Sequence, residues 1–132
     1  MDDSGMKIVI VEDNPDLSDI YKTRLSALGY QCTTATDGIA ALYFIQQQNP
    51  DLVLLDLMVP DIAGDEILKR MRSSHWGKDI PVLIISNLNE ADAPAGLREL
   101  GIVNYVVKAN LANDQIDQLV NSILRPAQSA SF

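Results

Sequence analysis

Five short apolar runs, separated by longer segments with helix signals, restrict the fold of this sequence more than any other feature. Runs that are mostly aliphatic are typical of parallel strands buried on both faces, and helices usually connect such strands. The alternation predicts a doubly wound α/β domain of (βα)5 type, with three layers, flavodoxin-like topology and strand order 2-1-3-4-5. The predicted strands span residues 7–11, 31–35, 51–56, 81–86 and 103–107.

Helix signals lie between the predicted strands. Asn14 is a suitable N-cap, Pro15 is suited to the first helical position, and Gly29 ends the helix that they begin. The other predicted helices span residues 37–48, 64–72 and 90–100, and a last one runs from an N-cap at Asn110 to Pro126.

The helix expected within residues 90–100 has the weakest signals. Pro94 and Gly96 both fall inside this segment. Proline removes a backbone donor and glycine carries a high entropy cost in a helix. We therefore expect this helix to be short or mobile.

Length and charge limit the class of protein. A chain of 132 residues is the size of one domain, so we expect a single domain at residues 1–126 and a flexible tail or linker start at 127–132. Ten basic and eighteen acidic residues give a net charge of -8, without a basic run to track nucleic acid. The chain has neither signal-peptide character nor a bilayer-length apolar stretch, so we expect a cytoplasmic protein without a membrane partner.

Three carboxylates follow two of the predicted strands. Glu12 and Asp13 come after the first strand, and Asp56 ends the third. In the order 2-1-3-4-5 these strand ends are neighbours, so the acids converge and repel one another unless a cation binds. Each acid alone reads best as a solvated loop residue, but the three together favour a Mg²⁺ site with oxygen ligands.

Ser86 ends the fourth predicted strand, and the fifth runs through Tyr105 to Lys108. Taken singly, Ser86 is an ordinary turn residue and Lys108 an ordinary surface lysine. Together they add a hydroxyl and a flexible ammonium to the same edge of the sheet. Carboxylates, cation, hydroxyl and ammonium form a set suited to phosphoryl transfer.

From about residue 7 to 124, the sequence resembles the receiver domain of two-component response regulators. The acidic "VED" follows the first strand, and "PDLVLLDLMVPDIAG" places Pro60 four and Gly64 eight residues beyond Asp56. "DGIAAL", "PVLIIS" and "NYVVK" appear in the order that the family has. The resemblance implies a phosphoacceptor domain of a two-component or phosphorelay system, which is a signalling domain and catalyses only its own phosphorylation and dephosphorylation.

The resemblance also implies roles for the acidic residues. Asp56 would accept a phosphoryl group from a histidine kinase, a phosphotransfer protein or a small acyl phosphate. Asp13, Asp56 and the backbone carbonyl of Met58 would bind Mg²⁺ directly, and Glu12 would act through a water molecule.

Lys108 would pair with Asp56 and then with the phosphoryl group. Ser86 would move to a phosphoryl oxygen, and Tyr105 would swing inward behind it, as the family's switch. The face made by residues 90–100, 103–107 and the last helix would bind the partner. That partner would be an unknown output domain, a target protein, or a second copy in a phosphorylation-dependent homodimer.

Two departures from the family pattern affect the expected site. Ala109 follows Lys108 where the family usually has proline, so we expect a trans bond there. Met58 and Leu88 are apolar at positions that tune acyl phosphate hydrolysis in the family. We expect both side chains to shield the phosphoaspartate from water.

Three other functions fit the fold class. A flavin-binding module needs a small-residue loop after the first strand, whereas "VEDNPD" is acidic. A Mg²⁺-dependent aspartyl phosphatase needs a second aspartate where Met58 stands. A degenerate receiver that acts only as a binding module would have no need of Asp13, Asp56, Ser86 and Lys108.

Overall fold

The computed structural model describes residues 5–125, and its centre is one parallel sheet. The strand order is β2-β1-β3-β4-β5, which confirms the predicted order and fold class. The boundary predicted at residue 126 and the tail at 127–132 lie outside the described residues. The strands are β1 (Lys7–Val11), β2 (Gln31–Ala35), β3 (Leu52–Leu55), β4 (Val82–Ser86) and β5 (Asn104–Val107).

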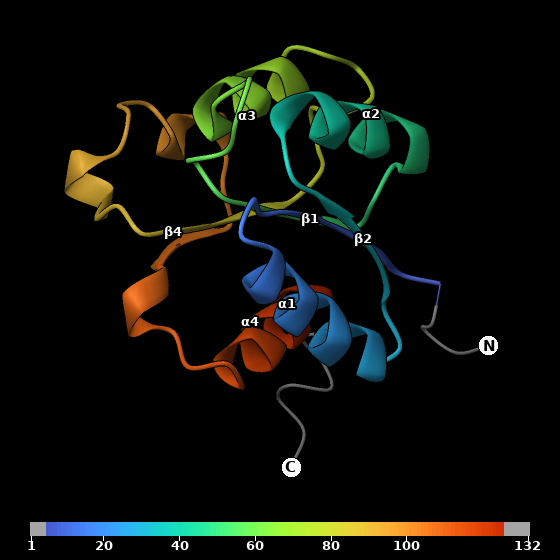
Figure 1. The fold of residues 1–132 in the computed structure, drawn as a ribbon. Coiled ribbons are helices and arrows are strands. Elements are labelled where there is room, and N and C mark those ends of the chain that lie inside the picture. Colours follow the sequence, from blue (N-terminus) through green and yellow to red (C-terminus); the bar gives the residue numbers. More distant parts are fainter. Residues whose placement is uncertain (1–4, 126–132) are drawn as a thin grey trace.

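Four α-helices cover the two faces of the sheet. Figure 1 shows α2 and α3 on one face and α1 and α4 on the other. None of the helices within residues 5–125 is both long and apolar enough to span a bilayer. The helices are α1 (Pro15–Ala27), α2 (Gly38–Gln48), α3 (Gly64–Arg72) and α4 (Gln115–Leu124).

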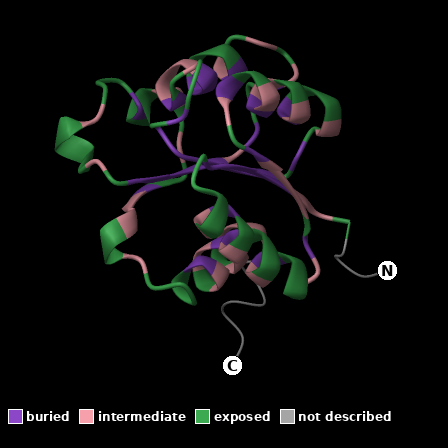
Figure 2. Ribbon diagram, in the orientation of Figure 1, coloured by how far each residue is buried: buried purple, intermediate pink, exposed green. Residues whose placement is uncertain are grey.

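The sheet buries both of its faces because side chains alternate along each strand. In β1, Val9 and Val11 pack in the cluster beneath α2 and α3, whereas Ile8 and Ile10 pack beneath α1 and α4. All residues of β3 and β4 are buried (Figure 2). This two-sided burial explains why these strands are almost wholly aliphatic, and it fixes where the strand ends emerge.

The first helix begins and ends as its sequence predicts. The Asn14 side chain accepts hydrogen bonds from the backbone N–H groups of Asp16 and Leu17, at 3.0 and 3.1 Å. Gly29 follows the C-cap with a φ of 98°, a conformation that glycine adopts without strain. The Asn14 cap therefore places the start of α1 directly after the acidic residues that follow β1, and Gly29 marks the end of the helix.

The segment predicted as a short helix at residues 90–100 contains two 3₁₀ turns, Glu90–Asp92 and Arg98–Leu100, and no α-helix. Pro94 and Gly96 lie between the turns, and Gly96 has a φ of 89° that an α-helix cannot contain. An exposed bidentate ion pair joins the turns, with Arg98 Nε 2.6 Å from Glu90 Oε2.

The last helix begins later than predicted, because Asn110 is not its N-cap. Residues Lys108–Asn110 form a 3₁₀ turn, and α4 starts at Gln115. The Gln115 side chain accepts a hydrogen bond from the Ala112 N–H at 2.6 Å, and its own N–H donates to the Ala112 carbonyl. Gln115 therefore closes the turn over residues 112–115. The N-cap preference of asparagine does not predict this turn, so it placed the helix start too early.

Gly64, the first residue of α3, packs against the backbone that follows β3. A Cβ atom added there would lie 2.5 Å from the Asp56 carbonyl oxygen and 2.6 Å from Leu57 Cα. The Gly64 N–H also donates to the Leu57 carbonyl at 2.9 Å. A glycine is therefore required for α3 to approach the end of β3 this closely.

Gly64→Ala is predicted to lower the free energy of unfolding by about 1–3 kcal/mol, because the added methyl group overpacks a backbone contact. Helix propensity alone would favour alanine, so the two effects have opposite signs. Urea unfolding of the variant measures the change, with Gly5→Ala as a control because no described atom lies within 4 Å of its Cβ position. Equal or greater stability of Gly64→Ala would contradict the packing argument.

Candidate functional site

The acidic residues converge at the carboxyl end of the sheet. Val11 and Leu55 are paired in the β1–β3 register, so Glu12, Asp13 and Asp56 follow neighbouring strand ends. Ligand oxygens of the three carboxylates lie within 4.8 Å of one another. Asp13 is exposed, whereas Glu12 and Asp56 are only 2% and 4% exposed. Two buried carboxylates so close together require positive charge nearby.

Lys108 supplies part of that charge. Its Nζ lies 2.7 Å from Asp56 Oδ2 and 2.7 Å from Glu12 Oε1, and its side chain is 12% exposed. Burial opposes a charged ammonium, but the hydrogen bonds to Asp56 and Glu12 outweigh burial and raise the pKa of Lys108. The lysine is therefore a fixed cation between two acids that come from different strands.

The remaining hydrogen bonds of the buried carboxylates come from backbone N–H groups. Asn14 N–H donates to Glu12 Oε2 at 3.0 Å, and Met58 N–H donates to Asp56 Oδ1 at 3.0 Å. Burial still raises the pKa of Glu12, although its bonds with Lys108 and Asn14 act in the opposite direction. One ammonium beside three carboxylates leaves the cluster with an excess of negative charge.

These residues border an open cleft of about 570 Å³. Carboxylate oxygens on one side and access from solvent on the other are the features that a hard divalent cation with retained waters requires. The donor set therefore fits Mg²⁺ chemistry. The lining residues are Glu12, Asp13, Asn14, Pro15, Asp16, Asp56, Met58, Asn87 and Lys108.

Ser86 and Tyr105 lie behind the cleft and are joined through the backbone of Leu88. Ser86 is fully buried, and its Oγ accepts a hydrogen bond from the Leu88 N–H at 3.3 Å. Tyr105 points inward, where its hydroxyl donates to the Leu88 carbonyl at 2.8 Å. Burial raises the pKa of the Tyr105 hydroxyl above its ordinary 10.0, although a hydrogen bond with Ser86 acts in the opposite direction. Both side chains thus hold the same residue of the β4–β5 connection.

Met58 and Leu88 were both expected to shield the phosphoaspartate, but only one of them lines the cleft. Met58 is 57% exposed and lines the cleft, whereas Leu88 is half-buried and is not among the lining residues. The polar side chain of Asn87 lines the cleft instead. Its place directly after Ser86, at the end of β4, is the sequence signal that would have identified it. The Lys108–Ala109 bond is trans, as expected.

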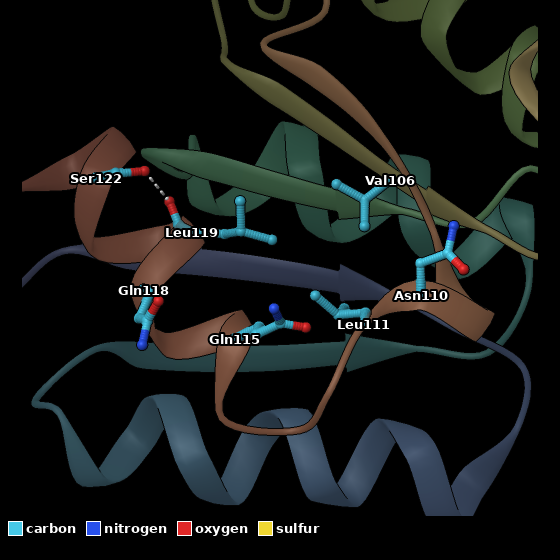
Figure 3. Close-up of a pocket in the computed structure, with 7 residues that line it drawn as sticks. All are labelled: Val106, Asn110, Leu111, Gln115, Gln118, Leu119 and Ser122. Atoms are coloured by element: carbon cyan, nitrogen blue, oxygen red, sulfur yellow. Dashed lines mark hydrogen bonds between the residues drawn. The ribbon is translucent and has the colours of Figure 1, made fainter.

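A second hollow of about 420 Å³ lies between β5 and α4 (Figure 3). Figure 3 shows Val106 of β5, Leu111 of the connection between β5 and α4, and Leu119 of α4 around it, with the amides of Gln115 and Gln118 at its rim. No charged side chain among the described residues lines this hollow. This hollow is therefore unsuited to binding a metal ion. Of the two sites, only the acidic cleft has the ligands for one.

Comparison with known proteins matches residues 8–121 to the family described as the response regulator receiver domain. A probable transcriptional regulator, ycf27 of Guillardia theta, is 35% identical over 127 residues, which cover 96% of this chain and 48% of that protein. The chain spans about half the length of the relatives of this kind that it matches.

Solved receiver domains have the same fold. The receiver domain of the Francisella response regulator 1452 superposes with a TM-score of 0.81 at 26% identity, over 93% of this chain and 99% of that one. The receiver domain of the sensor histidine kinase PA1611 from Pseudomonas aeruginosa PAO1 gives 0.75 at 26% identity, over 91% and 98%. That structure has a magnesium ion coordinated in its active site cleft.

The raised pKa of Glu12 predicts a pH-dependent stability. A carboxyl group whose folded-state pKa exceeds its ordinary 4.5 contributes stability that is present below pH 4.5 and is lost as the pH rises through the folded-state pKa. The wild type should therefore lose stability relative to Glu12→Gln as the pH rises from 4.5 toward neutral. Urea unfolding of both proteins in a metal chelator tests this, and a difference that is constant or grows with pH would contradict it.

Proposed function

The chain belongs to the response regulator receiver domain family, and from this premise we propose that Asp56 is the residue that accepts the phosphoryl group. The donor is a histidine kinase, a phosphotransfer protein or a small acyl phosphate. The observation that carries this proposal is the buried Asp56 carboxylate at the end of β3, held by Lys108 at 2.7 Å beside two further acids. No other group of three acidic or metal-ligating side chains lies this close together among the described residues.

In the proposed reaction, one Asp56 oxygen forms a bond to phosphorus while the bond from phosphorus to the donor breaks. For a phosphohistidine donor, the imidazole leaves with the electron pair and takes up a proton. For an acyl phosphate, the leaving group is a carboxylate. Burial of Asp56 beside fixed hydrogen-bond donors favours this transfer, because phosphoryl transfer depends on positioning and charge neutralisation.

Asp13, Asp56 and the Met58 carbonyl are the proposed direct Mg²⁺ ligands, with Glu12 acting through a water molecule. When bound, Mg²⁺ would neutralise charge on the carboxylates and on the phosphoryl oxygens. Asp13 is exposed and lines the cleft, whereas Glu12 is buried and already bonded to Lys108. The exposure of Asp13 suits a direct ligand.

The same contacts suggest how phosphorylation changes the rest of the domain. Lys108 would exchange Asp56 for a phosphoryl oxygen. Ser86 would move to donate its hydroxyl hydrogen to another phosphoryl oxygen, and in moving it would give up the bond that it accepts from the Leu88 N–H. The bond from Leu88 N–H to Ser86 Oγ is long, at 3.3 Å, so it is a weak contact to replace. Leu88 would then be held only by Tyr105, and the β4–β5 connection would shift with it.

The proposed output surface is the face formed by residues 90–100, β5 and α4. Its first part has only two 3₁₀ turns, which are joined by the exposed Glu90–Arg98 pair. Such a segment opens at low free-energy cost. We expect an output domain, a target protein or a second copy of the receiver to bind this face, whose apolar hollow appears in Figure 3. The ycf27 relatives are named as transcriptional regulators, which supports a further output domain.

Incubation with a small acyl phosphate and Mg²⁺ should add one labile phosphoryl group to the chain, detected by intact mass. Asp56→Asn should gain none, because the accepting carboxylate is absent. Asp51→Asn is the matched control, since Asp51 lies at the opposite end of β3 and should leave phosphorylation unchanged. A phosphoryl group that persists in Asp56→Asn, or no gain in the wild type, would overturn the proposal.

A further inference from the structure

Asp61, in the connection between β3 and α3, combines a strained backbone with long-range hydrogen bonds. Its φ is 64°, in the left-handed region that aspartate tolerates better than most residues. Its Oδ1 accepts the N–H groups of Gly38 and Ile62 at 2.7 and 2.6 Å. Its Oδ2 accepts the Ile39 N–H at 3.4 Å. A residue of this loop therefore caps the first turn of α2, which lies more than twenty residues earlier in the chain.

The backbone of the same loop also packs against the start of α2. Gly38 N–H lies 3.2 Å from the Pro60 carbonyl oxygen. A Cβ atom on Gly38 would lie 2.5 Å from Ile62 Cβ and 2.6 Å from the Ile62 carbonyl oxygen. Only glycine permits this approach, so the loop and the helix start fit together at more than one point.

The α2 helix already has a local cap. The Asp37 side chain accepts the Ala40 N–H at 2.8 Å, as an N-cap residue does. Asp61 takes the Gly38 and Ile39 N–H groups, which Asp37 leaves free. The Asp61 contacts with Gly38 and Ile39, here called the Asp61 clasp, thus add a tertiary connection to a helix end that is already capped.

The loop that the clasp holds carries part of the cation site. It leaves β3 at Asp56, passes Met58 at the edge of the cleft, and enters α3 at Gly64. Near its two ends it is fixed by the Met58 N–H bond to Asp56 Oδ1 and by the Gly64 N–H bond to the Leu57 carbonyl. Between these bonds, the clasp provides side-chain hydrogen bonds from the loop to another element, while Val59 and Ile62 pack their side chains against the core.

We infer that Asp61 is a positioning residue for Mg²⁺ binding, because the Asp61 clasp fixes the loop that supplies the Met58 carbonyl. This inference rests on the proposed function, in which that carbonyl is a direct ligand. Without the clasp, the loop samples other conformations and the carbonyl is less often in place. Mg²⁺ affinity then falls, although Asp61 itself is not a ligand.

Calorimetric titration of the 132-residue chain with MgCl₂ tests the inference, alongside unfolding midpoints measured in a chelator. Asp61→Gly keeps the backbone conformation accessible and removes the clasp, and it should weaken Mg²⁺ binding about tenfold or more, as loss of supporting contacts does in metal sites. Asp61→Asn keeps an acceptor oxygen and tolerates the positive φ, so it should bind Mg²⁺ nearly as well as the wild type. Asp37→Gly should lower the unfolding midpoint without this loss of affinity.

Three results would overturn the inference while leaving the proposed function intact. Asp61→Gly could bind Mg²⁺ as the wild type does, Asp61→Asn could lose as much affinity as Asp61→Gly, or Asp37→Gly could lose as much as either. The second result would assign the effect to charge, and the third to helix stability. If Asp61→Gly does not fold, Gly38→Ala breaks the same contact from the α2 side and decides the question by the same titration. Absence of Mg²⁺ binding in the wild type would refute both the proposed function and the inference.

Discussion

The contact on which the rest of the structure depends is the one between Lys108 and the two buried carboxylates, Asp56 and Glu12. Unpaired, either carboxylate would cost several kcal/mol to bury. The strand order 2-1-3-4-5 makes the pairing feasible, since β1 and β3 are neighbours and Lys108 reaches across the end of β4. Two-sided burial of the aliphatic strands then fixes where each charge emerges. Because one ammonium does not balance three acids, the site is left able to attract a cation.

Two groups of contacts lead away from this cluster. On one side, Ser86 and Tyr105 hold the backbone of Leu88, at the start of a connection that has little regular structure. On the other, the loop after Asp56 is fixed to α2 through Asp61. In the proposed function, the first group changes when Ser86 changes partner, whereas the second holds in place the loop that would supply a Mg²⁺ ligand. A segment with little regular structure and a loop bonded to α2 thus flank the same site, which is consistent with the proposed cation binding and switching.

The fold and the convergence of the acids were predictable because both follow from local patterns. Aliphatic runs give the strands, and parallel topology brings Glu12, Asp13 and Asp56 to one edge. Contacts between distant parts of the chain were not predictable in this way. The bond between Glu12 and Lys108 and the cap from Asp61 on α2 depend on tertiary packing. The Gln115 turn, which replaces the predicted N-cap at Asn110, is a local contact that the N-cap preference of asparagine does not indicate. Pro94 and Gly96 correctly marked a weak helix, but not that two 3₁₀ turns replace it.

The central claim is that the excess negative charge at these strand ends binds a cation. The most direct test is to measure how the free energy of unfolding depends on Mg²⁺ concentration. A cation that binds only the folded state raises the free energy of unfolding in proportion to the logarithm of its concentration above the dissociation constant. The account predicts such a rise for the wild type at constant ionic strength, and a much smaller one for Asp13→Asn. Stability that does not change with Mg²⁺, or that rises equally in Asp13→Asn, would contradict it.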